Sequence, residues 1–178
     1  MSIIRIIRAG DCPEIPWKNG GGTTREIAVF PPGAGMSDFD WRLSMAKVEQ
    51  PGPFSAFPGI DRVLTVLEGE LALTGPSMDI LLTSVCSPVS FRGDMEVSGR
   101  PADGPVLDVN AMIRRGTYLC TVKRLKVDEK AVAADWGFLI ALEPQILGGR
   151  GLARLDCMEF GDCVAVGGDA LHINIRRI

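Results

Sequence analysis

The chain has 178 residues, of which 46% are hydrophobic and 23% charged, with a formal net charge of −3. A globular chain of this length buries a core without needing disulfides or metal, and its composition excludes the disordered and fibrous classes. The small negative charge offers no basic field for nucleic acid, and no apolar stretch approaches the ~20 residues of a membrane helix. We therefore expect neither nucleic acid nor a membrane as a partner.

Cysteine and histidine usage bears on the compartment and on metal binding. Five cysteines are an odd number, and Arg5, Arg8 and Asp11 interrupt the N-terminal apolar run that a signal peptide requires. We expect a cytoplasmic protein with reduced cysteines. His172 is the single histidine, which excludes His-rich metal sites. It lies on the polar side of a predicted strand, so we expect it at the surface.

Short runs rich in Val, Ile, Leu and Thr, separated by Gly and Pro, follow one another along the chain. Such runs predict strands, here at residues 3–7, 23–30, 41–48, 63–67, 70–74, 106–113, 119–127, 138–142, 163–166 and 171–175. Hairpin turns are predicted at Glu68-Gly69 and at Gly167-Gly168-Asp169. Only residues 128–135 predict a helix. Many short strands with almost no helix indicate an all-β sandwich or barrel.

A weak internal repeat indicates two similar β-modules fused head to tail. One shift of the sequence aligns five identical pairs: Leu64 with Leu139, Leu67 with Leu142, Glu68 with Glu143, Gly93 with Gly168, and Asp94 with Asp169. We predict an N-terminal module at residues 1–105 and a C-terminal module at residues 106–178. Because no Ser/Gly linker separates them, we expect one shared core, with strands that can swap between modules.

The densest cluster of glycines and polar residues runs over residues 16–26. Three consecutive glycines, residues 20–22, leave backbone N–H groups unobstructed and could form a small anion-binding nest. Lys18 and Arg25 flank these glycines, Asn19 precedes them, and Trp17 offers an aromatic wall. The alternative is a flexible turn that enters a strand, with Trp17 as a core anchor.

A second feature, residues 52–69, has the layout of the first cupin signature, in which two histidines precede a metal-binding glutamate seven residues before a glycine. Counting back from Gly69 places Arg62 at the glutamate position, and the histidine positions fall near Ala56 and Pro58. We therefore expect no metal. A guanidinium at the mouth of a barrel would instead bind a carboxylate or phosphate bidentately. The alternative is a surface residue in an ion pair.

A third feature is the predicted strand at residues 106–113. Side chains alternate between the two faces of a strand, so Asp108 and Asn110 share a face with Met112 and Arg114. Two polar residues in the middle of a strand are consistent either with the wall of a pocket or with a row facing solvent. Both interpretations stay open at this stage.

Three ordered motifs carry a resemblance to the HutD/Ves family. They are Trp17-Lys18-Asn19-Gly-Gly-Gly-x-Thr-Arg-Glu-Ile, the stretch from Trp41-Arg42-x-Ser44-x-Ala46 to Gly59-Ile60-Asp61-Arg62, and Asp108-x-Asn110-x-Met112-x-Arg114-Arg115. The resemblance covers the chain from the first strand to the last. It implies a small cytoplasmic bacterial protein with a double-cupin fold, the double-stranded β-helix. It also implies a ligand-binding or regulatory role connected with histidine utilisation.

These observations favour a metal-free, cofactor-free cupin-like binding or regulatory protein for a small carboxylate metabolite, with N-formylglutamate or urocanate as candidates. Arg62 would clamp the carboxylate, while Lys18, Asn19 and Arg25 add donors and Trp17 excludes water. Asp108 and Asn110 would belong to the same binding site. One alternative is a metal-independent cupin-type enzyme that uses Glu26, Asp61, Asp108 or Lys18 as its acid or base. The other alternative is a structural or protein-binding module. The sequence is also compatible with a homodimer.

Overall fold

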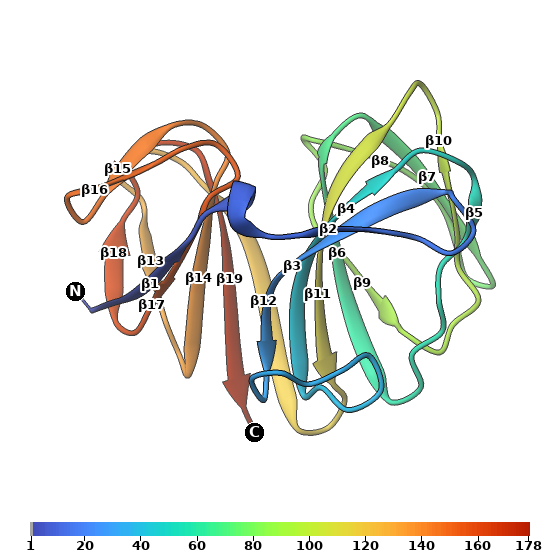
Figure 1. Ribbon diagram of the computed structural model, residues 1–178, viewed down its shortest axis with the longest axis horizontal. Helices are drawn as coiled ribbons and strands as arrows, with labels where there is room; N and C mark the ends of the chain where they lie inside the picture. The colour runs from blue at the N-terminus through green and yellow to red at the C-terminus, as the bar shows by residue number, and fades with distance from the viewer. Residues whose placement is uncertain (1) are drawn as a thin grey trace. The chain divides into compact units, whose positions relative to one another are not determined.

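The computed structural model describes residues 2–178, which form strands and one short 3-10 turn, η1, at Ala9–Asp11 (Figure 1). Among these residues there is no helix with the length and apolar character needed to cross a membrane. The chain divides into two compact units. One unit consists of residues 13–115, and the other combines residues 2–12 with residues 116–178.

The unit of residues 13–115 contains two antiparallel sheets. The larger has the order β2 (Glu14–Pro16), β3 (Gly22–Phe30), β4 (Trp41–Val48), β11 (Val106–Arg114), β6 (Ile60–Glu68) and β9 (Val89–Arg92). The smaller has the order β5 (Gly52–Pro53), β10 (Ser98–Pro101), β7 (Glu70–Gly75) and β8 (Met78–Thr83). Buried side chains from both sheets pack against one another, among them Leu64 and Val66 from β6 with Leu71 and Leu73 from β7.

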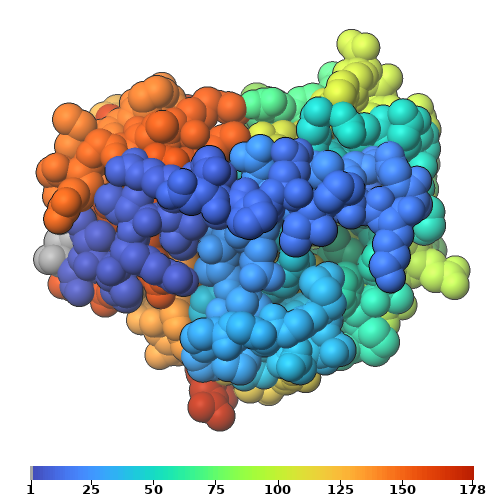
Figure 2. Space-filling view, in the orientation of Figure 1, coloured from blue at the N-terminus to red at the C-terminus, as the bar shows by residue number. Residues whose placement is uncertain are grey.

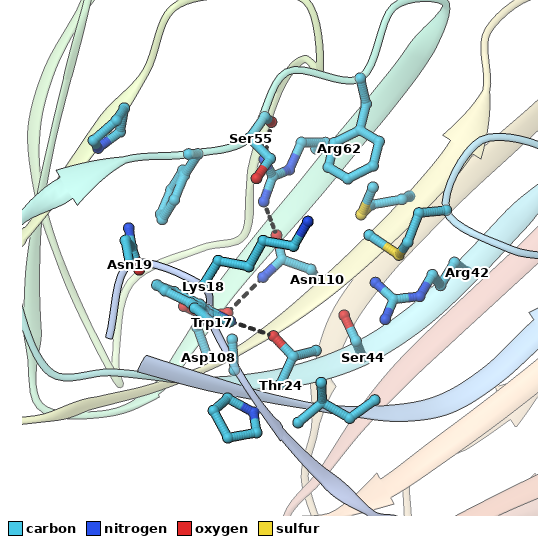
Figure 3. A pocket seen from close by; sticks show the side chains of 18 residues that line it. Trp17, Lys18, Asn19, Thr24, Arg42, Ser44, Ser55, Arg62, Asp108 and Asn110 are labelled. Atoms are coloured by element: carbon cyan, nitrogen blue, oxygen red, sulfur yellow. Dashed lines mark hydrogen bonds between the residues drawn. The ribbon is translucent and has the colours of Figure 1, made fainter. Parts of the chain in front are cut away.

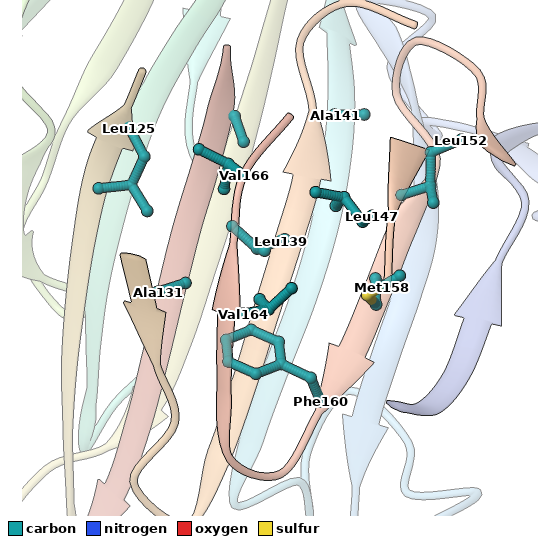
Figure 4. Packing of buried hydrophobic residues seen from close by; sticks show 11 residues of the cluster. Leu125, Ala131, Leu139, Ala141, Leu147, Leu152, Met158, Phe160, Val164 and Val166 are labelled. Atoms are coloured by element: carbon teal, nitrogen blue, oxygen red, sulfur yellow. The ribbon is translucent and has the colours of Figure 1, made fainter. Parts of the chain in front are cut away.

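The other unit contains one five-stranded sheet and two short ribbons. The sheet order is β1 (Ile3–Ile7), β17 (Cys157–Phe160), β14 (Trp136–Ala141), β19 (Ala170–Arg177) and β12 (Tyr118–Leu125). The ribbons pair β13 (Lys130–Val132) with β18 (Cys163–Ala165), and β15 (Gln145–Leu147) with β16 (Arg150–Leu152). Figure 4 shows its densely packed apolar core, which includes Leu139, Met158 and Phe160.

The all-β prediction is confirmed, but three local predictions are wrong. Residues 128–135 form no helix, because residues 130–132 are strand β13 and pair with β18. Glu68-Gly69 is no hairpin, because β6 pairs with β9 and β11 whereas β7 lies in the other sheet. The turn at residues 167–169 likewise joins strands of different sheets. Strands β13, β6 and β18 instead pair with strands from more distant parts of the chain.

The unit boundary also differs from the predicted division at residues 105 and 106. Strand β11 lies between β4 and β6, so residues 106–115 belong to the unit of residues 13–115. Strand β1 pairs with β17, so the first strand belongs with the C-terminal part of the chain. The first strand of the sequence is therefore grouped with strands from residues 116–178.

The expectation that His172 lies at the surface is wrong. Only 9% of the residue is exposed, and the centre of its ring lies 5.8 Å from the ring centre of Phe160. Burial lowers the pKa of the imidazole to about 4, and nearby Lys123 adds to this effect. The polar pattern of the last strand was misleading because both faces of β19 are covered at this point: His172 is buried, and so are its neighbours Leu171 and Ile173.

Gly69 lies between β6 of the larger sheet and β7 of the smaller sheet, where the chain passes from one sheet to the other. Substituting it tests how closely the backbone packs at this point. Its φ is +77°, and an added Cβ would lie 2.7 Å from the carbonyl oxygen of Pro105. Gly104 has almost the same φ, +76°, but open space around it. We expect Gly69→Ala to lower the free energy of unfolding by about 3 kcal/mol and Gly104→Ala by about 1 kcal/mol. Urea denaturation measures both, and equal losses would contradict the close approach.

Candidate functional site

The unit of residues 13–115 contains a cavity of about 580 Å³. This volume suits a small metabolite. The cavity is lined by side chains from β4, β6 and β11, by the β2–β3 segment and by residues 53–57. Ile15, Lys18 and Met36 are exposed at this cavity, and they belong to the blue stretch of residues 13–40 that forms part of the visible surface in Figure 2.

The register of three neighbouring strands sets the pattern of side chains on the cavity floor. In an antiparallel sheet, residues directly opposite one another point to the same face. Three such rows cross β4, β11 and β6: Arg42–Met112–Arg62, Ser44–Asn110–Leu64, and Ala46–Asp108–Val66. The floor therefore carries one arginine on each side of β11, with a polar pair along β11 itself.

Arg62 lies buried at this floor, with 6% of the residue exposed. Its guanidinium carbon lies 5.0 Å from the ring centre of Phe54, 5.3 Å from that of Phe91 and 5.9 Å from that of Phe57. Nη2 donates to Oδ1 of Asn110 at 2.8 Å, and Nη1 makes a long contact of 3.4 Å with the carbonyl oxygen of Ser55. Figure 3 shows Arg62 together with Asn110 and Ser55.

Burial lowers the pKa of Arg62 to about 10, with nearby Asp108 opposing the shift and Arg42 adding to it. The guanidinium therefore remains protonated at neutral pH. The alternative interpretation of Arg62 as a surface residue in an ion pair is wrong, because the residue is buried and its side-chain partners are neutral groups.

Asp108 is fully buried on β11 and also contributes to the cavity wall. Its Oδ1 accepts a hydrogen bond of 2.6 Å from Nδ2 of Asn110, whereas its Oδ2 is buried with no partner among residues 2–178. Burial raises the pKa of this carboxyl group to about 7, although Arg62 and the hydrogen bond from Asn110 act in the opposite direction. The solvent-facing alternative for this strand is therefore wrong for Asp108 and Asn110.

Arg42 is a lining residue that the sequence interpretation did not select. It is 7% exposed, and its Nε donates to Oε2 of Glu26 at 2.8 Å. Next to it, the Ser44 side chain also lines the cavity. Strict alternation along residues 41–48 could have identified both, because Trp41 and Leu43 mark the opposite face of β4.

The glycine-rich segment positions three of the predicted residues. The indole Nε1 of Trp17 donates to Oγ1 of Thr24 at 2.7 Å, and its ring occupies the space beside Gly22. Lys18 is exposed and extends across the cavity in Figure 3. Asn19 also lines the cavity, and its Oδ1 accepts from the backbone N–H of Gly21 at 2.9 Å.

The expected anion nest is not formed by the first two glycines. The N–H of Gly20 donates to the carbonyl of Trp17, and that of Gly21 to the side chain of Asn19. At Gly22, an added Cβ would lie 2.2 Å from the carbonyl oxygen of Lys47, so this glycine permits close packing on β4. The glycines therefore shape a tight turn between β2 and β3.

Arg25 does not line the cavity. Its Nη2 instead makes an ion pair of 3.0 Å with Oε2 of Glu14 across β2 and β3, where both side chains are about 40% exposed. The prediction that Arg25 contributes to the same site is wrong, because alternation along β3 directs it away from Thr24, which does line the cavity.

The residues at the cupin metal positions do not fit a metal. Arg62 occupies the glutamate position, and Ala56 and Pro58 stand near the histidine positions. Across residues 2–178 there is no group of three or more His, Cys, Asp or Glu side chains arranged to bind a metal ion. A guanidinium repels a cation and attracts an anion, so this position favours an anion over a metal ion.

The other unit lacks a counterpart of Arg62. In its sheet Leu139 lies opposite His172, just as Leu64 lies opposite Asn110. Two residues before Leu139 the chain has Gly137, where an added Cβ would lie 2.6 Å from the Cβ of Ala133. The space used by the Arg62 side chain in one unit is therefore filled by packing in the other.

Comparisons with known proteins agree with this fold. A 41% identical relative, matched over 122 residues, is named an uncharacterised 21.2 kDa protein in the hutC 3′ region of Pseudomonas putida. A Protein Ves from Citrobacter koseri is 43% identical over 101 residues. These alignments take in 66% and 56% of this chain, which spans only 62% and 52% of the two relatives' lengths.

Solved structures extend the likeness to nearly the whole chain. The structure of HutD from Pseudomonas fluorescens SBW25, in a formate condition, has a TM-score of 0.88 and 30% identity, with 98% of both chains covered. YhhW from Escherichia coli has a TM-score of 0.62, covering 95% of this chain and 96% of its own, but is 9% identical and shows the fold alone.

Fold and pocket together define an all-β protein of the cupin type with an arginine at a metal-ligand position. The HutD family model matches residues 9–174. The chain therefore belongs to the HutD family, as its three motifs predicted.

The raised pKa of the Asp108 carboxyl group predicts that the stability of the protein depends on pH. Because its pKa is raised to about 7, the folded chain retains a proton that the unfolded chain releases near pH 4. The free energy of unfolding therefore falls as the pH rises from about 4 to about 7. We expect wild type to lose on the order of 2 kcal/mol relative to Asp108→Asn between about pH 5 and pH 8. Urea unfolding of both proteins measures the difference, and parallel profiles would show that Asp108 ionises normally.

Proposed function

We propose that this protein is a metal-free, cupin-type binding or regulatory protein for a small carboxylate metabolite. The observation that carries the proposal is the buried guanidinium of Arg62 at the cavity floor. Within the part of the chain that the structure describes, two of its five N–H groups have partners, and neither partner is a carboxylate. A carboxylate ligand would supply both the missing charge and the missing acceptors.

The rest of the cavity supports an anionic ligand. Arg42 lies on the far side of β11, and Lys18 extends over the opening, so three cationic side chains line the cavity. Glu26 compensates Arg42, and Asp108 is close to half-protonated at neutral pH. The balance of charge at the cavity is therefore positive, and a low-polarity environment screens it less than water would.

Apolar lining residues favour a ligand with a carbon skeleton over a bare ion. Phe54, Phe57, Met112 and Trp17 all contribute to the wall. A metabolite that combines a carboxylate with a short organic body matches this mixture of charged and apolar groups.

A link to histidine utilisation suggests which metabolites to test. The name of the Pseudomonas putida relative places that protein in the hutC 3′ region, and family membership points the same way. N-formylglutamate and urocanate are carboxylates of histidine degradation, and they are our first candidates.

Substituting Arg62 tests the proposal. Charge-assisted contacts of this kind contribute about 1.5–3 kcal/mol, so Arg62→Ala should weaken the binding of N-formylglutamate or urocanate roughly ten- to a hundredfold. Arg62→Lys should restore only part of the affinity, because an ammonium group lacks the planar two-point geometry. Calorimetric titration provides the affinities, and melting curves confirm that the variants are folded.

Arg25→Ala is the matched control, because Arg25 is also an arginine on the larger sheet but does not line the cavity. It should bind as wild type does. If folded Arg62→Ala retains the wild-type affinity, Arg62 is not the anion-binding group. If neither metabolite binds wild type or raises its melting temperature, the alternative of a module without these ligands is favoured.

Asp108 favours a second candidate function, a metal-independent enzyme. A carboxyl group with a pKa of about 7 inside a cavity can accept or donate a proton at neutral pH. Incubating each metabolite with wild type and with Asp108→Asn, followed by NMR analysis of the products, separates catalysis from binding. Turnover by wild type that is lost in Asp108→Asn would support the enzyme.

A further inference from the structure

Asp108 has surroundings that suit a neutral carboxylic acid better than a carboxylate. An ionised carboxylate offers about four acceptor positions, yet Asp108 receives a single hydrogen bond, from Nδ2 of Asn110. Its second oxygen is buried without a partner within residues 2–178. A buried charge with so few donors is costly, and a proton on Oδ2 removes that cost.

The other charged groups that line the cavity with Asp108 come from three elements. Arg62 on β6 is the cation that favours the ionised form of Asp108. Arg42 on β4 is ion-paired with Glu26, and Lys18 in the β2–β3 turn is exposed at the opening. The uncharged neighbours of Asp108 include Ala46 and Val66 opposite it on the adjacent strands, and Asn110 beside it on β11.

Asn110 connects Asp108 to the anion-binding arginine. Its Nδ2 donates to Asp108, which leaves its Oδ1 as the acceptor for Nη2 of Arg62. The three side chains form a continuous chain of hydrogen bonds along the cavity floor (Figure 3). A change of charge at one end is therefore felt at the other across a poorly solvated path.

An anion bound to Arg62 would remove the support for a charged Asp108. Without ligand, the positive charge of Arg62 offsets part of the cost of ionising Asp108. A bound carboxylate brings one negative charge that cancels this positive charge. The cancellation favours protonation of Asp108.

We propose that the pocket takes up a proton together with its anionic ligand, and that Asp108, linked to Arg62 through Asn110, accepts that proton. The buffer acid loses the proton, and an O–H bond forms on Oδ2 of Asp108. The inference rests on the proposed function, because it requires an anion at Arg62. Asp108 would thus make ligand affinity depend on pH through its link to Arg62.

The consequence is a loss of affinity as the pH rises. Where ligand-free Asp108 is ionised and ligand-bound Asp108 is protonated, binding one ligand takes up one proton. Affinity then falls by up to about tenfold per pH unit above neutrality. N-formylglutamate is a suitable probe, because its carboxyl groups stay ionised across this range.

Calorimetric titration of N-formylglutamate in two buffers with different ionisation heats measures the proton directly. At about pH 7.5 we expect wild type to take up a substantial fraction of one proton per ligand. Asp108→Asn keeps the size of the side chain and an acceptor for Asn110, and it should bind without proton uptake and with an affinity independent of pH. Asp61→Asn is the control, because Asp61 pairs with Arg115 away from the cavity and should leave proton uptake unchanged.

The possible results separate this inference from the proposed function. Binding by wild type without proton uptake overturns the inference and leaves the proposed function intact. Proton uptake that persists in Asp108→Asn assigns the proton to another group, which also overturns it. If neither N-formylglutamate nor urocanate binds wild type, the proposed function fails and the inference fails with it.

Discussion

Burial of the Arg62 guanidinium is the constraint on which the pocket depends. A cation removed from water requires compensation, and here three phenyl rings, from Phe54, Phe57 and Phe91, surround the group while Asn110 accepts one of its hydrogen bonds. No carboxylate forms a direct ion pair with it among residues 2–178. The arrangement holds the charge in place and leaves it incompletely neutralised, which is the condition for attracting an anion.

The same constraint explains the character of Asp108. This carboxyl group is close enough to Arg62 to respond to its charge, yet Asn110 is its single side-chain hydrogen-bond partner among residues 2–178. A direct salt bridge would have neutralised both groups. The intervening amide leaves Arg62 without a direct counter-ion and leaves the pKa of Asp108 at about 7. In the function that we propose, anion binding and proton binding are therefore linked through one chain of hydrogen bonds.

Much of the fold could be predicted from the sequence, because alternation and turn residues are local signals. The strands at residues 3–7 and 41–48 have the predicted bounds, and that at 106–113 is one residue short. The errors arose where the pairing partner is distant. Gly69 looked like a hairpin turn, yet the chain changes sheets there, and residues 130–132 become a strand only because β18 lies beside them.

For the site, the sequence by itself determined which residue types were available: an arginine at the metal-ligand position, and Asp108 and Asn110 alternating on one strand. Only the tertiary structure decided how they combine. Register across β4, β11 and β6 adds Arg42 to the cavity, while pairing with Glu14 keeps Arg25 outside it. The physical reason is that side-chain direction follows from local backbone geometry, whereas burial, and with it the charge state of Asp108, depends on strands that meet only after folding.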